Sequence, residues 1–573
     1  MSTNKKHKVT PKKKFQKRDH FSDSPPIRAM RLRDIVLLVG VFCIAAVLAF
    51  TGLTNHPFWD DEANTAIIGK NLLQTGHFSA WDGVNVFGYR FGADLDENLN
   101  NIGDPPLQHV VAAAGIWLFG ETTFGGRIIF MFAGLLALIP LFFWTHWHLR
   151  GQVAAWLPTL LVALSPAYLM YIRQCRYYPI AMLLSVLILT AFSYPKTVNR
   201  PTFCAILASG LSACLLMLTN YLCAVALAAV LPMFMLLKRY RQKQQYLLIG
   251  VTYVAFFIAG IYILIEANPF AATGILEGDI TGLARLVSLL WLHVTGLGSF
   301  EFFPLLVPLF LVILLAIKSF RNGRSLAIEG LFIVLVMCCY IVITVLFTPQ
   351  PIFRGTIADM RYVAPLILIG AVATACFIQS LWNGAHILYR TIAFAILVLV
   401  VTTNIFCLNF INKQPLSATI YKYINENLHP YTTGSESLIK YLRSLPEKTV
   451  VQIFPSYMTN QALFYAPKLH YCCQLMPNRT IRANVRVNLP EYVFNGRTKP
   501  DYIFVGDGQY SPELVLAYFE HKHGIGAYRI KEILSDDWRD MSRPEIPLHS
   551  FGPPAESGFG GPDRGFVVLE RVL

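Results

Sequence analysis

The chain has 573 residues, of which 54% are hydrophobic and 14% are charged, and its formal net charge is +14. Soluble chains of this length divide into domains with largely polar surfaces, and they do not need so large an apolar share. Repeated apolar runs of about 20 residues indicate transmembrane helices instead. The composition therefore predicts a polytopic α-helical membrane protein and excludes an ordinary soluble protein.

Residues 1–33 form a strongly basic leader. They hold eleven Lys and Arg residues against two Asp. A basic tail can bind nucleic acid, but this one directly precedes the first apolar span, so we do not expect a nucleic-acid partner. We expect a disordered cytoplasmic leader that orients the first helix and contacts anionic membrane lipid.

The transmembrane region covers residues 34–411, and its apolar runs predict about eleven spans. They are 35–53, 128–147, 153–171, 178–194, 203–218, 221–237, 247–265, 302–317, 328–347, 363–381 and 391–411. Basic loops follow the even-numbered spans, which puts those loops and the N-terminus in the cytoplasm by the positive-inside rule. We expect a multi-pass protein of the bacterial inner (plasma) membrane.

The first outer loop, residues 54–127, contains the apolar segment Leu107–Phe119. Its 13 residues fall short of the ~20 needed to cross a bilayer. We expect an interfacial helix started by Asp104-Pro105-Pro106, because proline is favoured where a helix begins. Residues 267–300, between two later spans, show no readable element.

Residues 412–573 are polar and mixed in charge, and they predict a soluble extracytoplasmic (periplasmic) α/β domain. Ser437–Arg443 reads as a helix, and Thr449–Phe454 and Tyr502–Val505 read as strands. The glycines of Gly506-Asp507-Gly508 lack the helix and spacing of a nucleotide-binding loop. Phe551–Gly565 reads as a loop.

Three consecutive carboxylates, Asp60, Asp61 and Glu62, follow the first span. Such a cluster at a bilayer surface costs desolvation and mutual repulsion, which favours a chemical role. The alternative is a cap, in which Asp60 or Asp61 accepts the first N–H groups of a helix beginning near Ala63.

Several arginines lie at the outer ends of spans, against the charge bias of the topology. They are Arg127, Arg173, Arg176, Arg354 and Arg361. Arginine suits bidentate binding of phosphate, so the group predicts a site for an anionic ligand. The alternatives are snorkelling to the lipid headgroups and salt bridges to the acidic first outer loop, which carries Asp94, Asp96, Glu97 and Asp104.

The order of these motifs resembles that of the GT-C glycosyltransferases, in particular the branch of protein O-mannosyltransferases and lipid A aminoarabinose transferases. The resemblance covers residues 35–411. It is carried by the acidic motif, Pro105-Pro106-Leu107, Leu118-Phe119-Gly120, Arg127, Leu164-Ser165-Pro166, Arg173 with Arg176 and Tyr177, and Arg361-Tyr362 before Pro365. Asp104 departs from the pattern, because many members have His or Lys there.

The resemblance implies a GT-C glycosyltransferase that takes a hexosyl or pentosyl group from a polyprenyl-phosphate donor by inverting displacement. The family's acidic pair corresponds to Asp60-Asp61 or Asp61-Glu62, and the spacing to Ala63 favours the second. Asp61 is then the expected base, and Glu62 is expected to orient it, bind the acceptor or hold a metal. The residues expected to bind substrate are Arg127, Arg173, Arg176, Tyr177, Arg361, Tyr362 and Asp104. No metal or other cofactor is predicted, although an acidic cluster can bind a divalent cation.

The acceptor, whether protein, lipid or glycan, stays open, and the first outer loop, residues 267–300 and the C-terminal domain are the regions expected to select it. The main alternative is a transporter or flippase for a lipid-linked or anionic substrate. It is disfavoured by the lack of an internal repeat and by the clustering of polar residues at one face. A receptor or assembly factor would leave the carboxylate cluster unexplained.

Overall fold

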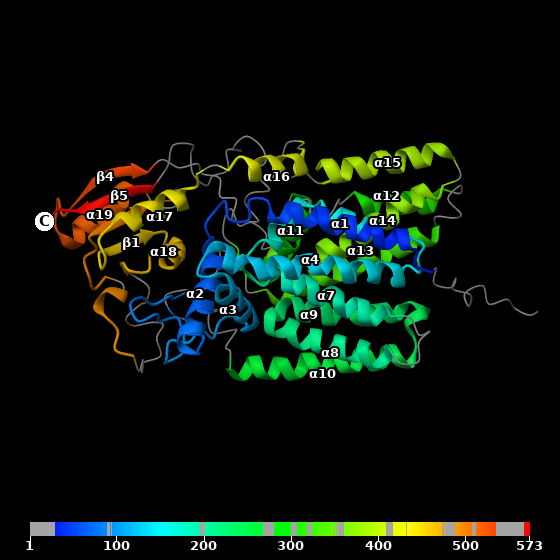
Figure 1. The fold of residues 1–573 in the computed structure, drawn as a ribbon, viewed down its shortest axis with the longest axis horizontal. Coiled ribbons are helices and arrows are strands. Elements are labelled where there is room, and N and C mark those ends of the chain that lie inside the picture. Colours follow the sequence, from blue (N-terminus) through cyan, green and yellow to red (C-terminus); the bar gives the residue numbers. More distant parts are fainter. Residues whose placement is uncertain are drawn as a thin grey trace, which may run out of the picture.

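The protein is elongated, as the computed structural model in Figure 1 shows, with a helical bundle at one end and a small sheet domain at the other. Helices α2 and α3 lie between the two parts. The structure describes residues 29–88, 92, 94–194, 201–266, 280–299, 306–317, 324–348, 350, 352, 360–384, 386–407, 416, 418–430, 432–472, 475, 487–494, 496–506, 511–534 and 566–572. Most of the basic leader, Arg354, and the predicted loop Phe551–Gly565 fall outside these ranges.

The bundle has a helix in each predicted span, but several of these helices are shorter or divided: 391–411 is reduced to a helix ending at Thr402, and 221–237 is an α-helix followed by a 3₁₀ helix. Its helices are α1 (Leu32–Phe50), α4 (Thr123–His148), α5 (Trp156–Ala163), α6 (Pro166–Ile172), α7 (Tyr178–Ser193), α8 (Pro201–Thr219), α9 (Tyr221–Val230), α10 (Lys243–Glu266), α11 (Gly282–Ser299), α12 (Val307–Ala316), α13 (Arg324–Phe347), α14 (Leu366–Trp382) and α15 (Ile387–Thr402), with the short helices η2 (Leu231–Leu236), η3 (Lys238–Tyr240) and η4 (Met360–Val363). Among the described residues, α1, α4, α10 and α13 are long and apolar enough to cross a membrane alone. The other apolar helices are shorter.

The predicted span 153–171 is two helices rather than one. Chain direction changes at Leu164-Ser165, where Ser165 caps α6 by accepting the Tyr168 N–H at 3.4 Å and Pro166 starts the new helix. Pro166 has no N–H to continue the ladder of α5, and the Ser165 cap supports a new helix there, whereas Pro140 lies inside α4 without ending it.

The segment 267–300 contains an element that the sequence interpretation lacked. Residues 282–299 form α11, an amphipathic helix whose apolar pattern is interrupted by Arg285 and His293. The Arg285 guanidinium donates to the Thr348 carbonyl at 2.7 Å, after the end of α13. Arg285 thus has a partner next to α13, and His293 Nδ1 lies 2.8 Å from the Leu289 carbonyl of α11 itself.

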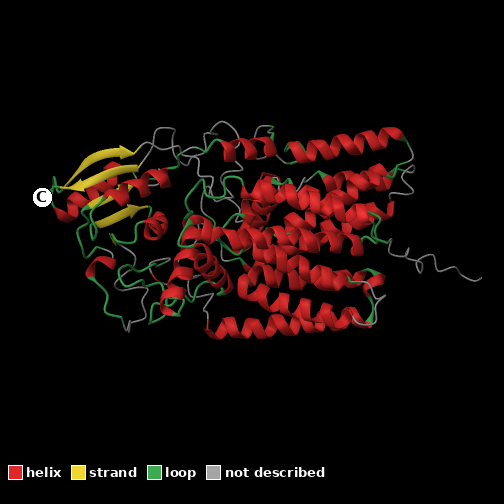
Figure 2. Cartoon of the chain, viewed as in Figure 1, coloured by secondary structure: helices red, strands yellow, loops and turns green. Residues whose placement is uncertain are grey.

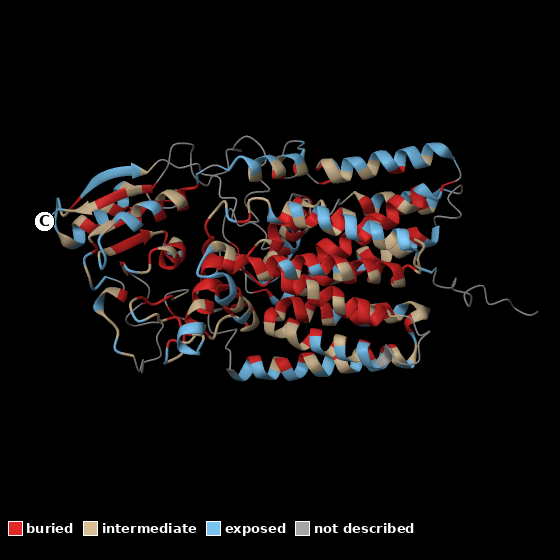
Figure 3. Cartoon of the chain, in the orientation of Figure 1, coloured by how far each residue is buried: buried red, intermediate tan, exposed pale blue. Residues whose placement is uncertain are grey.

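Burial separates a packed centre from a lipid-facing rim. Helices α4, α7 and α14 are mostly buried, whereas α10 and α15 present apolar side chains outward (Figure 3). Phe257 and Ile265 of α10 are largely exposed, as are Ile387 and Phe394 of α15. An exposed apolar surface of this extent on long helices is typical of contact with lipid hydrocarbon.

The C-terminal domain contains a five-stranded mixed sheet (Figure 2). Its strand order is β2-β1-β3-β5-β4, with β1 parallel to β2 and β3, and with β5 antiparallel to β3 and β4. The elements are α16 (Thr419–Leu428), α17 (Gly434–Ser444), β1 (Val450–Phe454), η5 (Ser456–Met458), α18 (Thr459–Tyr465), β2 (His470–Tyr471), η6 (Glu491–Val493), β3 (Tyr502–Val505), α19 (Pro512–His523), β4 (Tyr528–Leu534) and β5 (Phe566–Arg571). The predicted helix 437–443 and both predicted strands are confirmed.

Two further elements connect the bundle to the sheet domain. Helix α2 (Asp60–Thr75) packs against α3 (Leu107–Phe119), and α18 of the C-terminal domain packs on α2. Gly69 permits the close approach of α2 and α3, because a Cβ there would lie 2.9 Å from the Ala113 backbone nitrogen. The predicted bounds of the 107–119 helix are confirmed, and this helix holds α2 at the mouth of the bundle.

Candidate active site

The first turn of α2 consists of the three predicted carboxylates. Trp59 is the N-cap residue, and Asp60, Asp61 and Glu62 are the first three helical residues, all buried. Neither aspartate is the cap, so that alternative is wrong; instead, the Glu62 carboxylate accepts the Trp59 N–H at 3.4 Å. The positive end of the helix dipole favours acids here, and successive residues on a helix point in different directions. The three carboxylates therefore have different partners.

Glu62 is held by Arg127 of α4. Its two oxygens accept hydrogen bonds from Arg127 Nε at 2.9 Å and Nη2 at 2.6 Å, and one also accepts the Cys175 N–H at 2.7 Å. The same guanidinium donates to the carbonyls of Leu53, His56 and Pro57 at 2.8–3.1 Å. This buried pair fixes the chain from the end of α1 to the start of α2.

Asp61 faces two arginines from separate elements. Arg361 of η4 donates to Asp61 Oδ2, and Arg176 Nε lies 3.8 Å from the same oxygen. Arg176 also donates to the Asp61 backbone carbonyl and to the Thr65 hydroxyl. The Asp61 side chain is 2% exposed and that of Arg361 is 23% exposed, so Arg361 is the more accessible of the pair.

Asp60 links the site to the C-terminal domain. Asn460 of α18 donates to Asp60 Oδ1. Next to it, the Tyr465 hydroxyl accepts the Phe58 N–H at 2.8 Å and lies 2.7 Å from the Thr123 hydroxyl. Burial raises the pKa of Tyr465 to about 12, so this hydroxyl stays protonated at neutral pH. The sheet domain thus completes one wall of the site.

Asp104 joins the same network from the first outer loop. Its carboxylate lies 3.7 Å from Arg176 Nη2 and accepts a hydrogen bond from the Asn64 amide at 3.1 Å. The neighbouring His109 of α3 has its Nδ1 3.5 Å from the Thr65 carbonyl. Asp104 is therefore a partner of Arg176, as the salt-bridge alternative anticipated for part of the arginine group.

Two aromatic rings flank the arginines. The ring of Tyr177 is nearly parallel to that of Tyr362, with centroids 6.4 Å apart. The guanidinium carbon of Arg176 lies 5.8 Å from the Tyr177 centroid, and that of Arg361 lies 5.4 Å from the Tyr362 centroid. Cation–π contacts of this kind orient a guanidinium without consuming its hydrogen-bond donors.

Arg173 belongs to a different cluster from the other arginines. It donates to the Tyr423 hydroxyl at 2.9 Å, to Asn427 Oδ1 and to the Gly52 carbonyl. These contacts connect the end of α6 to α16 and to the end of α1. In this geometry Arg173 holds α16 against the bundle, whereas Arg176 and Arg361 converge on Asp61.

The structure adds residues that the sequence interpretation missed. Asn64 and Thr65 are polar positions one turn after the acidic motif, so helical spacing from Asp61 could have indicated them. His109 lies within the predicted interfacial helix, and its polarity was a usable signal. Asn460 and Tyr465 lie some 400 residues away along the chain, and nothing in their local sequence indicated this contact.

Within the described ranges, no group of three or more His, Cys, Asp or Glu side chains is arranged to hold a metal ion. The carboxylates of the acidic motif are directed instead to guanidinium, amide and backbone N–H groups.

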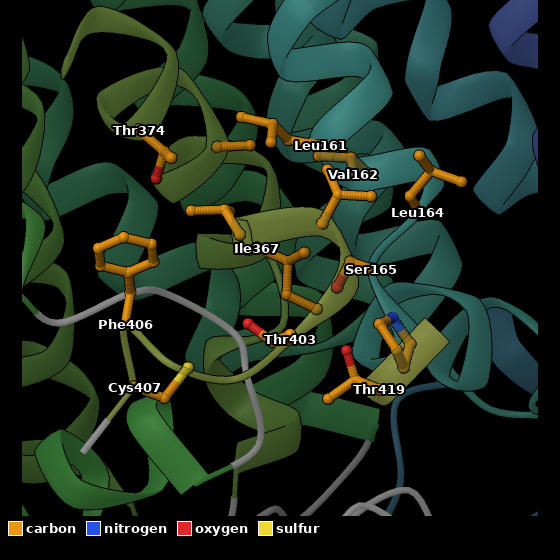
Figure 4. A pocket seen from close by; sticks show the side chains of 14 residues that line it. Leu161, Val162, Leu164, Ser165, Ile367, Thr374, Thr403, Phe406, Cys407 and Thr419 are labelled. Atoms are coloured by element: carbon orange, nitrogen blue, oxygen red, sulfur yellow. The ribbon is translucent and has the colours of Figure 1, made fainter. Parts of the chain in front are cut away.

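A small pocket, partly open to its surroundings, lies at the break between α5 and α6 (Figure 4). Leu161, Val162 and Ser165 form one wall, and Ile367, Ala371 and Thr374 of α14 form another. The remaining side comes from the chain after α15 and from the first residue of α16, with Thr403, Phe406, Cys407 and Thr419. Most of the lining residues are apolar, and Ser165, Thr374, Thr403 and Thr419 add polar groups.

The arrangement of the bundle and the appended α/β domain is the GT-C fold, as the resemblance implied. The chain superposes on the crystal structure of ArnT from Cupriavidus metallidurans in the apo state with a TM-score of 0.54 and 14% identity, over 94% of this chain and 98% of that one. For ArnT bound to undecaprenyl phosphate the TM-score is 0.53 and the identity 15%, over the same shares.

A third solved structure is more distant. The archaeal oligosaccharyltransferase AglB from Archaeoglobus fulgidus, in complex with an inhibitory peptide and a dolichol-phosphate, has a TM-score of 0.49 and 11% identity, over 86% of this chain and 72% of that one. No family model and no curated protein matches the sequence. The shared fold and the apolar helices make this chain a membrane protein of the GT-C structural class.

Proposed function

We propose that this protein transfers a hexosyl or pentosyl group from a polyprenyl-phosphate donor to an acceptor at the extracytoplasmic face of the membrane. The observation that carries the proposal is the buried Asp61 carboxylate facing the guanidiniums of Arg361 and Arg176. Asp61 can accept a proton while the more exposed Arg361 neutralises a departing phosphate, which is the pairing that this displacement requires. The fold adds support, because ArnT shares it and has been crystallised with undecaprenyl phosphate.

The proposed reaction is a single displacement. The acceptor hydroxyl oxygen attacks the anomeric carbon as the bond from that carbon to the phosphate oxygen breaks. The hydroxyl proton passes to Asp61, and the polyprenyl phosphate leaves as a monoester. One displacement inverts the anomeric configuration.

Arg361 contacts Asp61, so binding of the donor phosphate can change the basicity of Asp61. A phosphate that attracts Arg361 removes one counter-charge from Asp61, and the carboxylate then becomes a better base. Arg361 is suited to this exchange because it is the more exposed partner. Arg176 stays anchored by the Thr65 hydroxyl and Asp104.

The remaining predicted residues divide into two groups within this proposal. Tyr177 and Tyr362 orient the arginines, while Asp104 restrains Arg176. Glu62, Asp60, Arg127 and Arg173 position the chain around the site through the contacts described above. The pocket at the α5–α6 break is the proposed position of part of the prenyl chain.

Proteoliposomes test the proposal against a flippase. The protein is reconstituted with undecaprenyl phosphate carrying a radiolabelled hexose, pentose or aminopentose, together with a membrane extract. Label that becomes covalently attached to a second molecule, and does so only with the protein present, supports transfer. Label that crosses the bilayer while still joined to undecaprenyl phosphate identifies a flippase and contradicts the proposal.

A further inference from the structure

Several buried polar atoms around the acidic turn have no hydrogen-bond partner among the described residues, and three of them matter here, although Arg176 Nε also lies 3.8 Å from Asp61 Oδ2 as an ion pair. These three are Asn64 Oδ1 on α2, His109 Nε2 on α3, and Arg176 Nε in the turn before α7. Asn64 is 2% exposed and His109 is 1% exposed. A buried polar atom without a partner costs about 1–3 kcal/mol, so a cluster of them calls for an explanation.

The hydrogen-bonding character of the two acceptors is fixed by their other contacts. The Asn64 amide nitrogen donates to the Asp104 carboxylate, which leaves Oδ1 as the outward acceptor. In His109, Nδ1 faces the Thr65 carbonyl, which can only accept, so Nδ1 carries the hydrogen and Nε2 has the lone pair.

His109 is also neutral at physiological pH. Burial lowers its pKa to about 4, Arg176 acts in the same direction, and Asp104 and the Thr65 carbonyl oppose the shift only in part. Helix α3, too short to span the membrane, holds this ring in the first outer loop beside α2. The ring therefore offers a stable lone pair to a ligand.

Two acceptors and a guanidinium donor in one cluster match hydroxyl groups, because each hydroxyl donates one hydrogen bond and accepts others. A phosphate diester has no hydrogen to donate, so it satisfies Arg176 but not Asn64 or His109. We propose that Asn64, His109 and Arg176 form the subsite for the hydroxyl groups of the donor sugar. This inference rests on the proposed function and names the part of the site that selects the donor.

Two side chains that contact the cluster or Asp61 are partly exposed. The Asp104 side chain is 25% exposed, and that of Arg361 is 23% exposed. A sugar entering beside them places its hydroxyls near Asn64 and His109 while its phosphate lies toward Arg361.

Binding measurements on the full-length protein in detergent test the subsite. The affinity for bare undecaprenyl phosphate is compared with the affinities for undecaprenyl phosphate carrying a hexose, a pentose or an aminopentose. The test variants are His109→Phe, which removes the acceptor, and His109→Gln, which retains one. His293→Phe is the matched control, because His293 is a second buried histidine whose Nδ1 lies 2.8 Å from the Leu289 carbonyl of its own helix.

We expect the wild type to bind at least one sugar-bearing lipid more tightly than the bare lipid. His109→Phe should reduce that preference about three- to tenfold, the value of one hydrogen bond. His109→Gln should restore part of the preference, and His293→Phe should leave it unchanged.

Three results would overturn the inference. They are a wild type that shows no preference for any sugar-bearing lipid, a preference that His109→Phe leaves intact, and an equal loss of affinity for bare and sugar-bearing lipids. If sugar transfer is nevertheless observed, the proposed function stands and only the subsite fails. A wild type that binds neither kind of lipid contradicts both.

Discussion

Replacing Glu62 with glutamine tests the idea that this carboxylate holds the site together rather than performing the chemistry. Glu62 is fully buried and accepts hydrogen bonds from the two Arg127 nitrogens and from the N–H groups of Trp59 and Cys175. A glutamine amide has one accepting oxygen, so its NH₂ group would meet donors where the second oxygen now accepts. The Arg127 charge would also lose its counter-ion inside the protein.

The expected loss of unfolding free energy is about 3–5 kcal/mol, the typical cost of removing one partner from a buried ion pair. The three carbonyls that bind Arg127 stay in place and favour the lower half of that range. Unfolding is followed by titrating sodium dodecyl sulfate into dodecyl maltoside micelles and recording tryptophan fluorescence.

The matched control is Glu121→Gln, in the same outer loop. Glu121 pairs with Lys70 at 2.8 Å, but its side chain is 51% exposed, so its removal should cost at most about 1 kcal/mol. If Glu62→Gln proves no more destabilising than Glu121→Gln, the buried pair is not what fixes the start of α2. The positioning role assigned to Glu62 would then be incorrect.

Three further changes have defined outcomes. Arg173→Ala should accelerate amide hydrogen exchange in α16, because it removes the contacts to Tyr423 and Asn427. An unchanged exchange rate would contradict the role of Arg173 in holding α16 against the bundle. The folded state holds His109 with a pKa of about 4 against an ordinary 6.5, so the unfolded chain takes up a proton that the folded chain excludes as pH falls. Stability should decrease by about 3 kcal/mol from pH 6.5 to pH 4, and His109→Gln should flatten that part of the curve. Ala371→Phe should fill the pocket at the α5–α6 break and weaken undecaprenyl phosphate binding about tenfold, provided that the variant unfolds like the wild type; unchanged affinity would place the prenyl chain elsewhere.

Much of the bundle could be predicted because its signals are local. Apolar runs, the 13-residue interfacial helix and the basic loops each depend on a short stretch of sequence, and the helix 107–119 matches to the residue. The break at Ser165-Pro166 was missed, because a proline does not always end a helix, as Pro140 within α4 shows. Helix α11 was missed because Arg285 and His293 interrupt its apolar pattern.

The candidate site was only partly predictable for a different reason. Asp61, Arg176 and Arg361 were singled out by charge and topology, and they do meet. Arg173 and Arg176 were both singled out because they lie at the outer end of a span, but Arg173 contacts α16 instead of Asp61. No local pattern distinguishes two arginines that are one turn apart. The contacts of Asn460 and Tyr465 depend on how the sheet domain packs on α2, which is a tertiary property.

The most direct test of the account compares Asp61→Asn with the wild type, measuring both the rate of sugar transfer and the affinity for undecaprenyl phosphate. Loss of a positioned base should lower the turnover number by at least about 100-fold. Since Arg176 and Arg361 remain, undecaprenyl phosphate should still bind at least as tightly. A variant that binds the lipid and no longer transfers sugar supports Asp61 as the base, whereas a turnover within a few-fold of the wild type would contradict the central claim.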